Sequence, residues 1–373
     1  MGADVSTIDP MVPVVGAPWS FLMHELSSSH PAETVLVLGG RGRFGLAAAQ
    51  AFARGGWRVL AQMRPGAAAP EVAGVTWLAQ ALDTPQAVEA LVAQVRRSGG
   101  ASVVVHALNP NRYTRQAWKR EAWPLLQSGM AVAQALGATI MLPGNVYNYG
   151  EAMPGVLLED TPQRPSMAMG RIRTDMEARL EQATRQGRLR AVIVRAGNFY
   201  GRGRGTWLDL AMLTGIRRGK LVLPGPLDVR TPWAYLPDLA RTFVAVAGAR
   251  AAMAPFESLH FSGHDLSGQD WVDVLQPLAR QQGWLSEQAT LRVGGLPWPL
   301  FSLLGPLVPS WATLVALRYL WNRPHRLDNR RLRALIGSEP HTPWPLALEH
   351  TLRDLGMLPA AAEPPVHSGT ARA

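Results

Sequence analysis

The residues whose spacing most clearly suggests chemistry are glycines near the start of the chain. Gly40, Gly42 and Gly45 stand in a GxGxxG arrangement, and Gly39, Gly42 and Gly45 also fit GxxGxxG. They follow an apolar run and precede a helical pattern, which is the context that a dinucleotide-binding loop requires. Glycines permit the tight turn, the close approach of the backbone to a pyrophosphate, and helix–strand packing. We therefore predict that phosphates bind at the start of this helix; the alternative is an ordinary glycine-rich turn.

The charges around this loop bear on which dinucleotide it binds. An NAD site usually has a carboxylate about 20 residues further on, which holds the ribose hydroxyls. Here the second apolar run ends in the letters AQMR at Arg64, without a carboxylate, and Arg41 and Arg43 lie in the loop. Because guanidinium groups bind phosphate well, we predict NADP as the cofactor, with NAD as the alternative. The competing interpretation is that these arginines are solvated surface charges.

Alternating apolar runs and helical patterns surround this loop. The apolar runs cover residues 34–38, 58–61, 75–78, 102–106, 139–142 and 191–194. The helical patterns cover residues 43–54, 85–97, 116–136 and 171–185. Strands that are apolar on both faces and alternate with helices indicate a parallel sheet covered on both sides. We therefore predict an α/β fold of the Rossmann type, a doubly wound parallel sheet, with a smaller, irregular C-terminal substrate region rich in Pro and Trp.

These patterns divide the chain into four parts. We expect a disordered or mis-assigned extension over 1–30, and translation starting at Met23 would account for most of it. No signal-peptide pattern is present in that extension. An NAD(P)-binding domain is expected over 31–197, and a substrate-binding region with segments returning to the sheet over 198–359. Residues 360–373 are rich in Ala, Pro, Gly and Ser, which predicts a disordered tail.

Composition excludes several classes of protein. The chain has 37 Lys+Arg against 27 Asp+Glu, a net charge of +10, no cysteine and 47% hydrophobic residues. It is too apolar to be intrinsically disordered. Without cysteine it has no disulfide scaffold, no thiolate nucleophile and no Cys-based metal site, and we assign no metal site. The basic residues are spread out, with no recognition-helix, zinc or RNP-type signature, so we expect no nucleic-acid partner.

One uncharged stretch is long enough to span a membrane. Residues 293–317 carry no charge, but four prolines within them would interrupt a spanning helix. We therefore expect a buried or lid-like segment, no membrane span, and a cytoplasmic protein. As part of the Pro/Trp-rich stretch 296–321, this segment is also compatible with covering an apolar substrate.

Several motifs occur in a recognisable order. They are GGRGRFG at 39–45, VVVHALNP at 103–110, NVYNYG at 145–150, RAGNFYG at 195–201 and WAYLPDLA at 233–240. Together they resemble the NAD-dependent epimerase/dehydratase family of extended short-chain dehydrogenases/reductases, from about residue 34 to 356. The resemblance, with the loop analysis, implies these cofactor-binding residues: Gly39, Gly40, Gly42, Arg43, Phe44, Gly45, Arg64, Asp83, His106 and Asn109. For His106, the alternative is a strand-end residue without proton chemistry.

The departures from the family pattern concern catalysis. Members that transfer hydride use a Tyr-x-x-x-Lys pair on the helix after the fifth strand, and a Ser or Thr on that strand. The lysine lowers the pKa of the tyrosine, which exchanges a proton with the substrate. The matching segment here is MAMGR, from Met167 to Arg171, and the Ser/Thr position falls at about Pro143 or Gly144. All three members of the usual triad are therefore replaced.

Two hypotheses for function remain. In the first, Tyr147 or Tyr149 donates the proton, helped by Asn145 and Arg171, in an NAD(P)-dependent epimerase, dehydratase or reductase with a non-standard centre. Its substrate would be a small molecule, either a nucleotide sugar or another carbonyl or hydroxyl compound. In the second, the protein is a catalytically inactive NADP-binding sensor or scaffold, and Tyr147 is a packed aromatic residue.

Other charged residues allow less specific predictions. Arg230 and five cations within residues 201–220 form either a phosphate-binding pocket or a solvated face. Asp175 and Glu177 are expected on a helix surface, where Glu177 has the i,i+4 spacing to pair with Arg173. Family likeness suggests a homodimer through the helices near 116–136 and 169–185.

Overall fold

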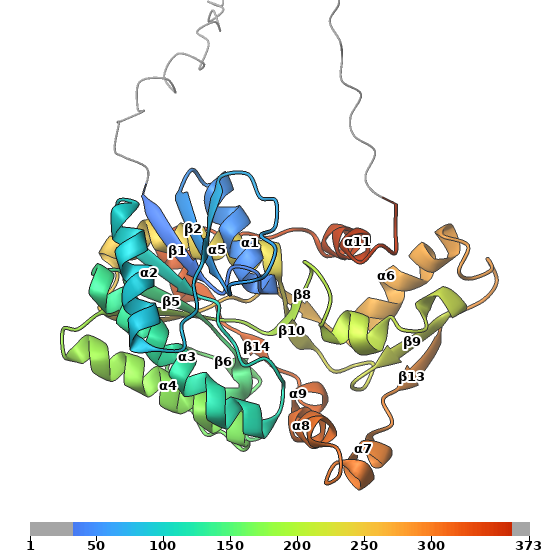
Figure 1. Cartoon of the computed structure of the whole chain (residues 1–373). Coiled ribbons are helices and arrows are strands. Elements are labelled where there is room, and N and C mark those ends of the chain that lie inside the picture. Colours follow the sequence, from blue (N-terminus) through green and yellow to red (C-terminus); the bar gives the residue numbers. More distant parts are fainter. Residues whose placement is uncertain (1–32, 360–373) are drawn as a thin grey trace, which may run out of the picture. The chain divides into compact units, whose positions relative to one another are not determined.

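The computed structural model describes residues 33–359 (Figure 1). Its centre is a seven-stranded parallel sheet in the order β11-β7-β5-β4-β1-β2-β3. The strands are β1 (Thr34–Leu38), β2 (Arg58–Met63), β3 (Val75–Ala79), β4 (Val103–His106), β5 (Thr139–Gly144), β7 (Arg190–Arg195) and β11 (Phe256–His260). The predicted doubly wound parallel sheet is confirmed, although β11 was not predicted as a strand. The expectations for 1–30, a start at Met23 and the tail 360–373 lie outside the described residues.

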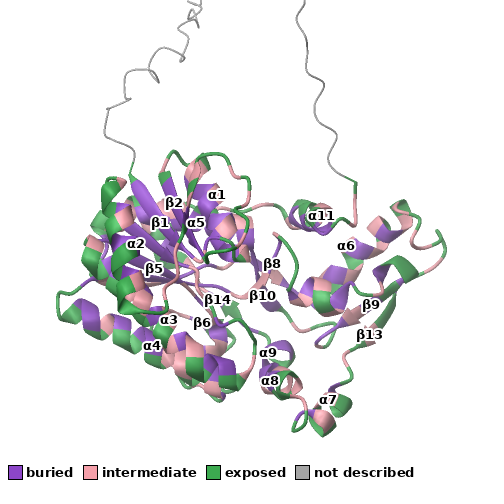
Figure 2. Ribbon diagram, in the orientation of Figure 1, coloured by how far each residue is buried: buried purple, intermediate pink, exposed green. Residues whose placement is uncertain are grey.

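Helices cover both faces of this sheet. One face carries α1 (Arg43–Arg54), α5 (Leu236–Ala249) and α10 (Arg330–Ile336), and the other carries α2 (Pro85–Arg97), α3 (Arg115–Leu136) and α4 (Ala168–Arg185). Successive strand residues point to opposite faces, so Val35 and Val37 enter the first core and Leu36 and Leu38 the second. Figure 2 shows the buried sheet between these helices. Burial on both faces explains why the strands are apolar throughout.

Residues after 197 also build a smaller core of their own. Its elements are β8 (Asn198–Tyr200), β9 (Lys220–Leu223), β10 (Thr231–Tyr235), β12 (His264–Leu266), β13 (Arg292–Gly295), α6 (Gly268–Gln281) and α11 (Trp344–Asp354). Strands β12-β10-β8 form one sheet, and β13 pairs with β9 in another. Aromatic side chains fill the space between them, with the Trp233 and Trp271 rings 4.8 Å apart and Trp271 and Trp344 4.4 Å apart. This packing accounts for the many tryptophans in the second half of the sequence.

The uncharged stretch 293–317 is divided into short elements. After β13 it forms α7 (Trp298–Leu304) and α8 (Pro309–Leu317), and α9 (Tyr319–Asn322) follows. Prolines stand in the first turns of α7 and α8, where the missing N–H is not needed. No helix within residues 33–359 is both long enough and apolar enough to cross a membrane.

A buried ion pair links α4 to the sheet. Both nitrogens at the end of the Arg195 side chain bond Glu177, at 3.0 and 2.6 Å, and one of them also donates to the Asn145 carbonyl at 2.6 Å. The Arg195 side chain is 1% exposed and that of Glu177 11%. The expectation that Glu177 lies on the helix surface is therefore wrong, because its partner comes from β7 rather than from α4. Asp175 is exposed as expected.

Candidate functional site

The glycine loop between β1 and α1 has no space for side chains. Gly39 has φ +75°, which favours glycine. A Cβ atom added to Gly45 would lie 2.3 Å from the carbonyl oxygen of Gly39, and one added to Gly42 would lie 3.2 Å from it. A Cβ on Gly40 would lie 2.9 Å from side-chain atoms of Ala61 and Trp77. The loop therefore approaches the start of α1 closely, as a phosphate-binding turn does.

Gln62, at the end of β2, supports this loop from the neighbouring strand. Its Oε1 accepts the N–H of Gly39 at 3.0 Å, and its Nε2 donates to the carbonyl of Gln80. The side chain is buried and uncharged. It occupies the strand end where sequence reasoning noted the missing carboxylate, but its role in holding the loop was not predicted.

Arg43 begins α1 and has an unsatisfied buried donor. Its Nη1 has no hydrogen-bond partner within residues 33–359. Burial lowers the pKa of Arg43, and the charge of Asp209 opposes this shift. Cβ atoms added to Gly203 and Gly205, in the segment after β8, would lie 3.8 and 3.9 Å from its side chain. The glycine cradle and an unpartnered guanidinium nitrogen fit an anionic pyrophosphate.

The other predicted cofactor residues occupy different environments. Phe44 points into the core, with its ring 4.8 Å from that of Phe243. Arg64 is exposed and donates to the Asn111 side chain at 2.9 Å. Asp83 is exposed just before α2. Asn109 accepts a long hydrogen bond of 3.4 Å from Arg173.

Tyr147 lies in a short 3₁₀ helix, η1 (Val146–Tyr149), directly after β5. The Asn145 side chain caps this helix by accepting the Tyr147 N–H at 3.0 Å. The hydroxyl of Tyr147 is hydrogen-bonded to the hydroxyl of Tyr113. Below it α4 approaches so closely that a Cβ on Gly170 would lie 2.4 Å from the Tyr147 carbonyl oxygen. The end of β5 and the start of α4 therefore fix this tyrosine, and Asn145 acts on its backbone.

Arg173, rather than Arg171, accompanies the two tyrosines. Arg171 is exposed, and the only hydrogen bond of its side chain within the described residues is a 3.5 Å contact to the Ser166 carbonyl. The Arg173 guanidinium stacks on the Trp118 ring at 5.0 Å. Its charge opposes the rise in pKa of both Tyr113 and Tyr147. The sequence did not predict Arg173 as a site residue, because the Tyr-x-x-x-Lys pair was matched to Met167 and Arg171.

The electrostatics of this cluster favour neutral tyrosines. Burial raises the pKa of Tyr147, against the hydrogen bond from Tyr113 and the charge of Arg173. Burial also raises the pKa of Tyr113 and lowers that of Arg173. Three further polar atoms lack partners among the described residues: Arg173 Nε, Trp118 Nε1 and Tyr319 Oη. Buried polar atoms are normally paired, so this group is a candidate contact region for a polar ligand.

The sequence of the chain matches the model of a known protein family. The profile described as "NAD dependent epimerase/dehydratase family" matches residues 35–259. The chain belongs to this family. No curated protein matched the chain.

Solved structures of epimerase/dehydratase type share the fold of this family member. A UDP-galactose 4-epimerase is 18% identical, covers 87% of this chain and 98% of its own, and has a TM-score of 0.65. MoeE5 in complex with UDP-glucose and NAD is 16% identical, with coverage of 87% and 98% and a TM-score of 0.64. The UDP-glucose 4-epimerase of Thermotoga maritima, solved with UDP-glucose, is 15% identical with the same coverage and TM-score as MoeE5. At these identities the likeness establishes the fold alone.

In this epimerase/dehydratase family member, the polar atoms of Tyr149 and His106 make hydrogen bonds within the core. The Tyr149 hydroxyl donates to His260 Nε2 at 3.0 Å, and His260 Nδ1 donates to the Leu157 carbonyl at 3.1 Å. His106 Nε2 donates to the Leu125 carbonyl at 3.0 Å. A Cβ on Gly129 would lie 2.3 Å from the His106 ring, so this histidine packs against α3. The geometry thus favours Tyr147 over Tyr149 as a proton donor.

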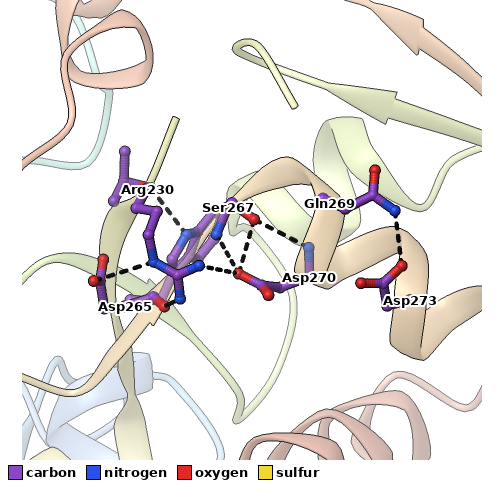
Figure 3. Close-up of polar contacts among 8 residues, drawn as sticks. Arg230, Asp265, Ser267, Gln269, Asp270 and Asp273 are labelled. Atoms are coloured by element: carbon purple, nitrogen blue, oxygen red, sulfur yellow. Dashed lines mark hydrogen bonds and ion pairs between the residues drawn. The ribbon is translucent and has the colours of Figure 1, made fainter. Parts of the chain in front are cut away.

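Four of the six cations in the basic cluster of the second region make contacts within the described residues. Figure 3 shows Arg230 between Asp265, at 3.3 Å, and Asp270, at 3.0 Å, with Ser267 and Asp270 forming the capping box of α6. Arg202 donates to the Gln50 side chain. Arg204 and Arg217 donate to main-chain carbonyls at 3.3 Å. These contacts favour the surface interpretation over a dedicated phosphate pocket.

The buried histidines predict a loss of stability in mild acid. Burial lowers the pKa of His106 to about 4 and that of His260 to about 3, from 6.5. At each of these two positions the unfolded chain therefore takes up a proton below pH about 6.5 that the folded chain does not. The contribution of the two histidines to the free energy of unfolding should be complete above that pH. It should fall towards pH 4 by up to about 1.4 kcal/mol per pH unit for each histidine.

Urea unfolding at pH 7, 6 and 5 measures this effect. His260→Gln should reduce the slope of the free energy of unfolding against pH by the share of one proton. His350→Gln, at an exposed position on α11, should leave that slope unchanged. A pH-independent free energy of unfolding would contradict the prediction.

Proposed function

We propose that this family member is an NAD(P)-dependent enzyme of the epimerase, dehydratase or reductase type with Tyr147, Tyr113 and Arg173 as its acid–base centre. The observation that carries the proposal is the cluster of these residues beside three unpartnered polar atoms. A short segment after β4 connects it to the glycine loop. A Cβ on Gly39 would lie 3.1 Å from Ala107, and Asn109, two residues on, bonds Arg173. Ligands of such sheets bind at the carboxyl ends of the strands, where both features lie.

The residues of the glycine loop would hold the dinucleotide. In this proposal Gly39, Gly42 and Gly45 form the turn beside the pyrophosphate, and Arg43 Nη1 bonds it. Bound nicotinamide supplies or accepts a hydride. Arg41 and Arg64, both exposed near the loop, would favour the 2′-phosphate of NADP.

Tyr147 would hold the transferable proton. Because burial raises its pKa, this phenol is protonated at neutral pH and donates to a substrate oxygen rather than accepting from one. Tyr113 orients the hydroxyl, and Arg173 stabilises negative charge developing nearby. A nucleotide sugar is the first substrate class to test, because MoeE5 and the Thermotoga maritima epimerase, which share this fold, were both solved with UDP-glucose.

Replacing Tyr147 tests the centre. Tyr147→Phe should lower kcat by about 10²–10⁴-fold, the usual contribution of a positioned general acid. Tyr149→Phe is the matched control, because its hydroxyl bonds His260 in the core, and it should leave kcat within a few-fold. Turnover is followed by nicotinamide absorbance and product analysis with a panel of nucleotide sugars. Full activity of Tyr147→Phe would refute the assigned donor.

A comparison of cofactors tests the preference for NADP. NADP should raise the melting temperature more than NAD at equal concentration, because only NADP carries the 2′-phosphate. Arg64→Ala combined with Arg41→Ala should weaken NADP binding about tenfold and leave NAD binding nearly unchanged. A larger shift with NAD would overturn the preference.

A second candidate is an inactive NADP-binding sensor or scaffold. If Arg173 stands at the lysine position of a Tyr-x-x-x-Lys pair, the tyrosine position falls at Met169, one helical turn earlier. Met169 is 1% exposed and has no proton to donate, which favours this second candidate. Turnover of cofactor with any metabolite would reject it.

The homodimer through α3 and α4 and the cytoplasmic location remain predictions. Sedimentation equilibrium tests the homodimer.

A further inference from the structure

A cavity of about 900 Å³ lies between the first turns of α3 and α4 and residues 305–316. The side formed by α3 and α4 carries apolar residues such as Met167 and Met169 together with four cations: Arg115, Lys119, Arg120 and Arg171. Arg120 pairs with Glu121 at 2.8 Å, whereas Arg115 and Lys119 make no side-chain hydrogen bond or ion pair with the described part of the chain. None of the described residues that line the cavity is acidic. Its positive charge is therefore largely uncompensated.

The opposite wall is apolar. Pro306, Pro309, Ala312 and Ala316 contribute to it from α8 and the turn before it. Leu303 and Leu307, which flank this turn, are 75% and 79% exposed. Such exposed apolar side chains next to a concave surface indicate a binding region rather than a core. The apolar surface therefore extends from the cavity to the outside of the protein.

We propose that this cavity binds an anionic amphiphile, with its hydrocarbon chain against α8 and its phosphate or carboxylate head at Arg115 and Lys119. The cavity is within the size range of small-molecule sites. No aromatic side chain is among the residues that line it, so it offers no platform for stacking a nucleotide base. An apolar wall opposite cations complements a hydrocarbon chain with an anionic head. The lining includes neither the glycine loop nor Tyr147, although Met169 and Arg171 flank Gly170, which packs against the Tyr147 carbonyl. Binding of the amphiphile does not depend on chemistry at Tyr147.

Calorimetric titration of the full chain tests this site with defined probes below their micelle concentrations. Dodecyl phosphate and dodecanoate represent phosphorylated lipids and free fatty acids, and dodecyl maltoside and inorganic phosphate are the controls. We expect saturable binding of at least one anionic amphiphile, and at least tenfold weaker binding of both controls. The tighter anionic probe identifies the head group.

Two variants locate the binding. Ala312→Trp, which fills the cavity from an exposed position, should weaken binding at least tenfold. The double variant Arg115→Glu and Lys119→Glu should do the same. The double variant Arg54→Glu and Arg97→Glu, at exposed positions on α1 and α2, is the matched charge control and should change binding less than twofold. Unchanged melting and unchanged stabilisation by nucleotide show that the variants fold.

Three results would overturn the proposal. They are the absence of binding by both anionic probes, equal binding of dodecyl maltoside or inorganic phosphate, and binding unaffected by Ala312→Trp in a folded variant.

Discussion

Glu177→Gln should lower the free energy of unfolding by about 3–5 kcal/mol, the usual cost of leaving one partner of a buried ion pair without its countercharge. The substitution preserves the shape of the side chain but removes the carboxylate that bonds Arg195 twice. Arg195 is 1% exposed and cannot turn to water. The effect should be large because the pair joins α4 to β7 and also bonds the carbonyl of Asn145 beside the proposed site.

Chemical denaturation at pH 7 measures this loss. Asp175→Asn is the matched control, because Asp175 is an exposed carboxylate two residues earlier on the same helix. Its substitution should change stability by less than about 0.5 kcal/mol. Equal stability of the two variants would show that the buried pair contributes little to the fold.

Gly45→Ala should abolish most of the stabilisation that nucleotide provides. The new Cβ atom would lie 2.3 Å from the Gly39 carbonyl oxygen, so α1 and the loop must separate. We expect at least tenfold weaker binding, or about 1.4 kcal/mol, and a less stable free protein because of overpacking. The increase in melting temperature with cofactor concentration measures the affinity.

Gly248→Ala is the control for glycine replacement. Gly248 is exposed on α5 and has no atoms within 4 Å of an added Cβ. Alanine should stabilise this helix by about 1 kcal/mol and leave cofactor binding unchanged. Normal binding by Gly45→Ala would show that the nucleotide does not occupy the predicted loop.

The central sheet was predictable wherever both of its faces are buried. Strands β1, β4 and β5 are short apolar runs that end in turns or polar residues, and the pattern gave them nearly the observed bounds. Strand β11 has the sequence FESLH and lies at the edge of the sheet, where β7 is its only partner strand within residues 33–359. Its polar residues hide it from a search for continuous apolar runs.

The candidate site was predictable only in part, because two of its parts depend on contacts between distant segments. Tyr113 precedes α3 and Tyr319 begins α9, and no local pattern associates them with Tyr147. The choice between Arg171 and Arg173 depends on which face of α4 turns inward. Glu177 could have settled this, since its pairing with Arg195 fixes the rotation of the helix, but a carboxylate on a polar helix usually indicates solvent.

The unpartnered nitrogen of Arg43 links ligand binding to the stability of the folded protein. A buried donor without a partner costs about 1–3 kcal/mol, and Arg43 Nη1 at the start of α1 has none among the described residues. An anion that bonds this nitrogen removes this cost and thereby holds more of the chain in the folded state. The abundance of the protein would then follow the supply of its ligand, with the empty form preferentially degraded.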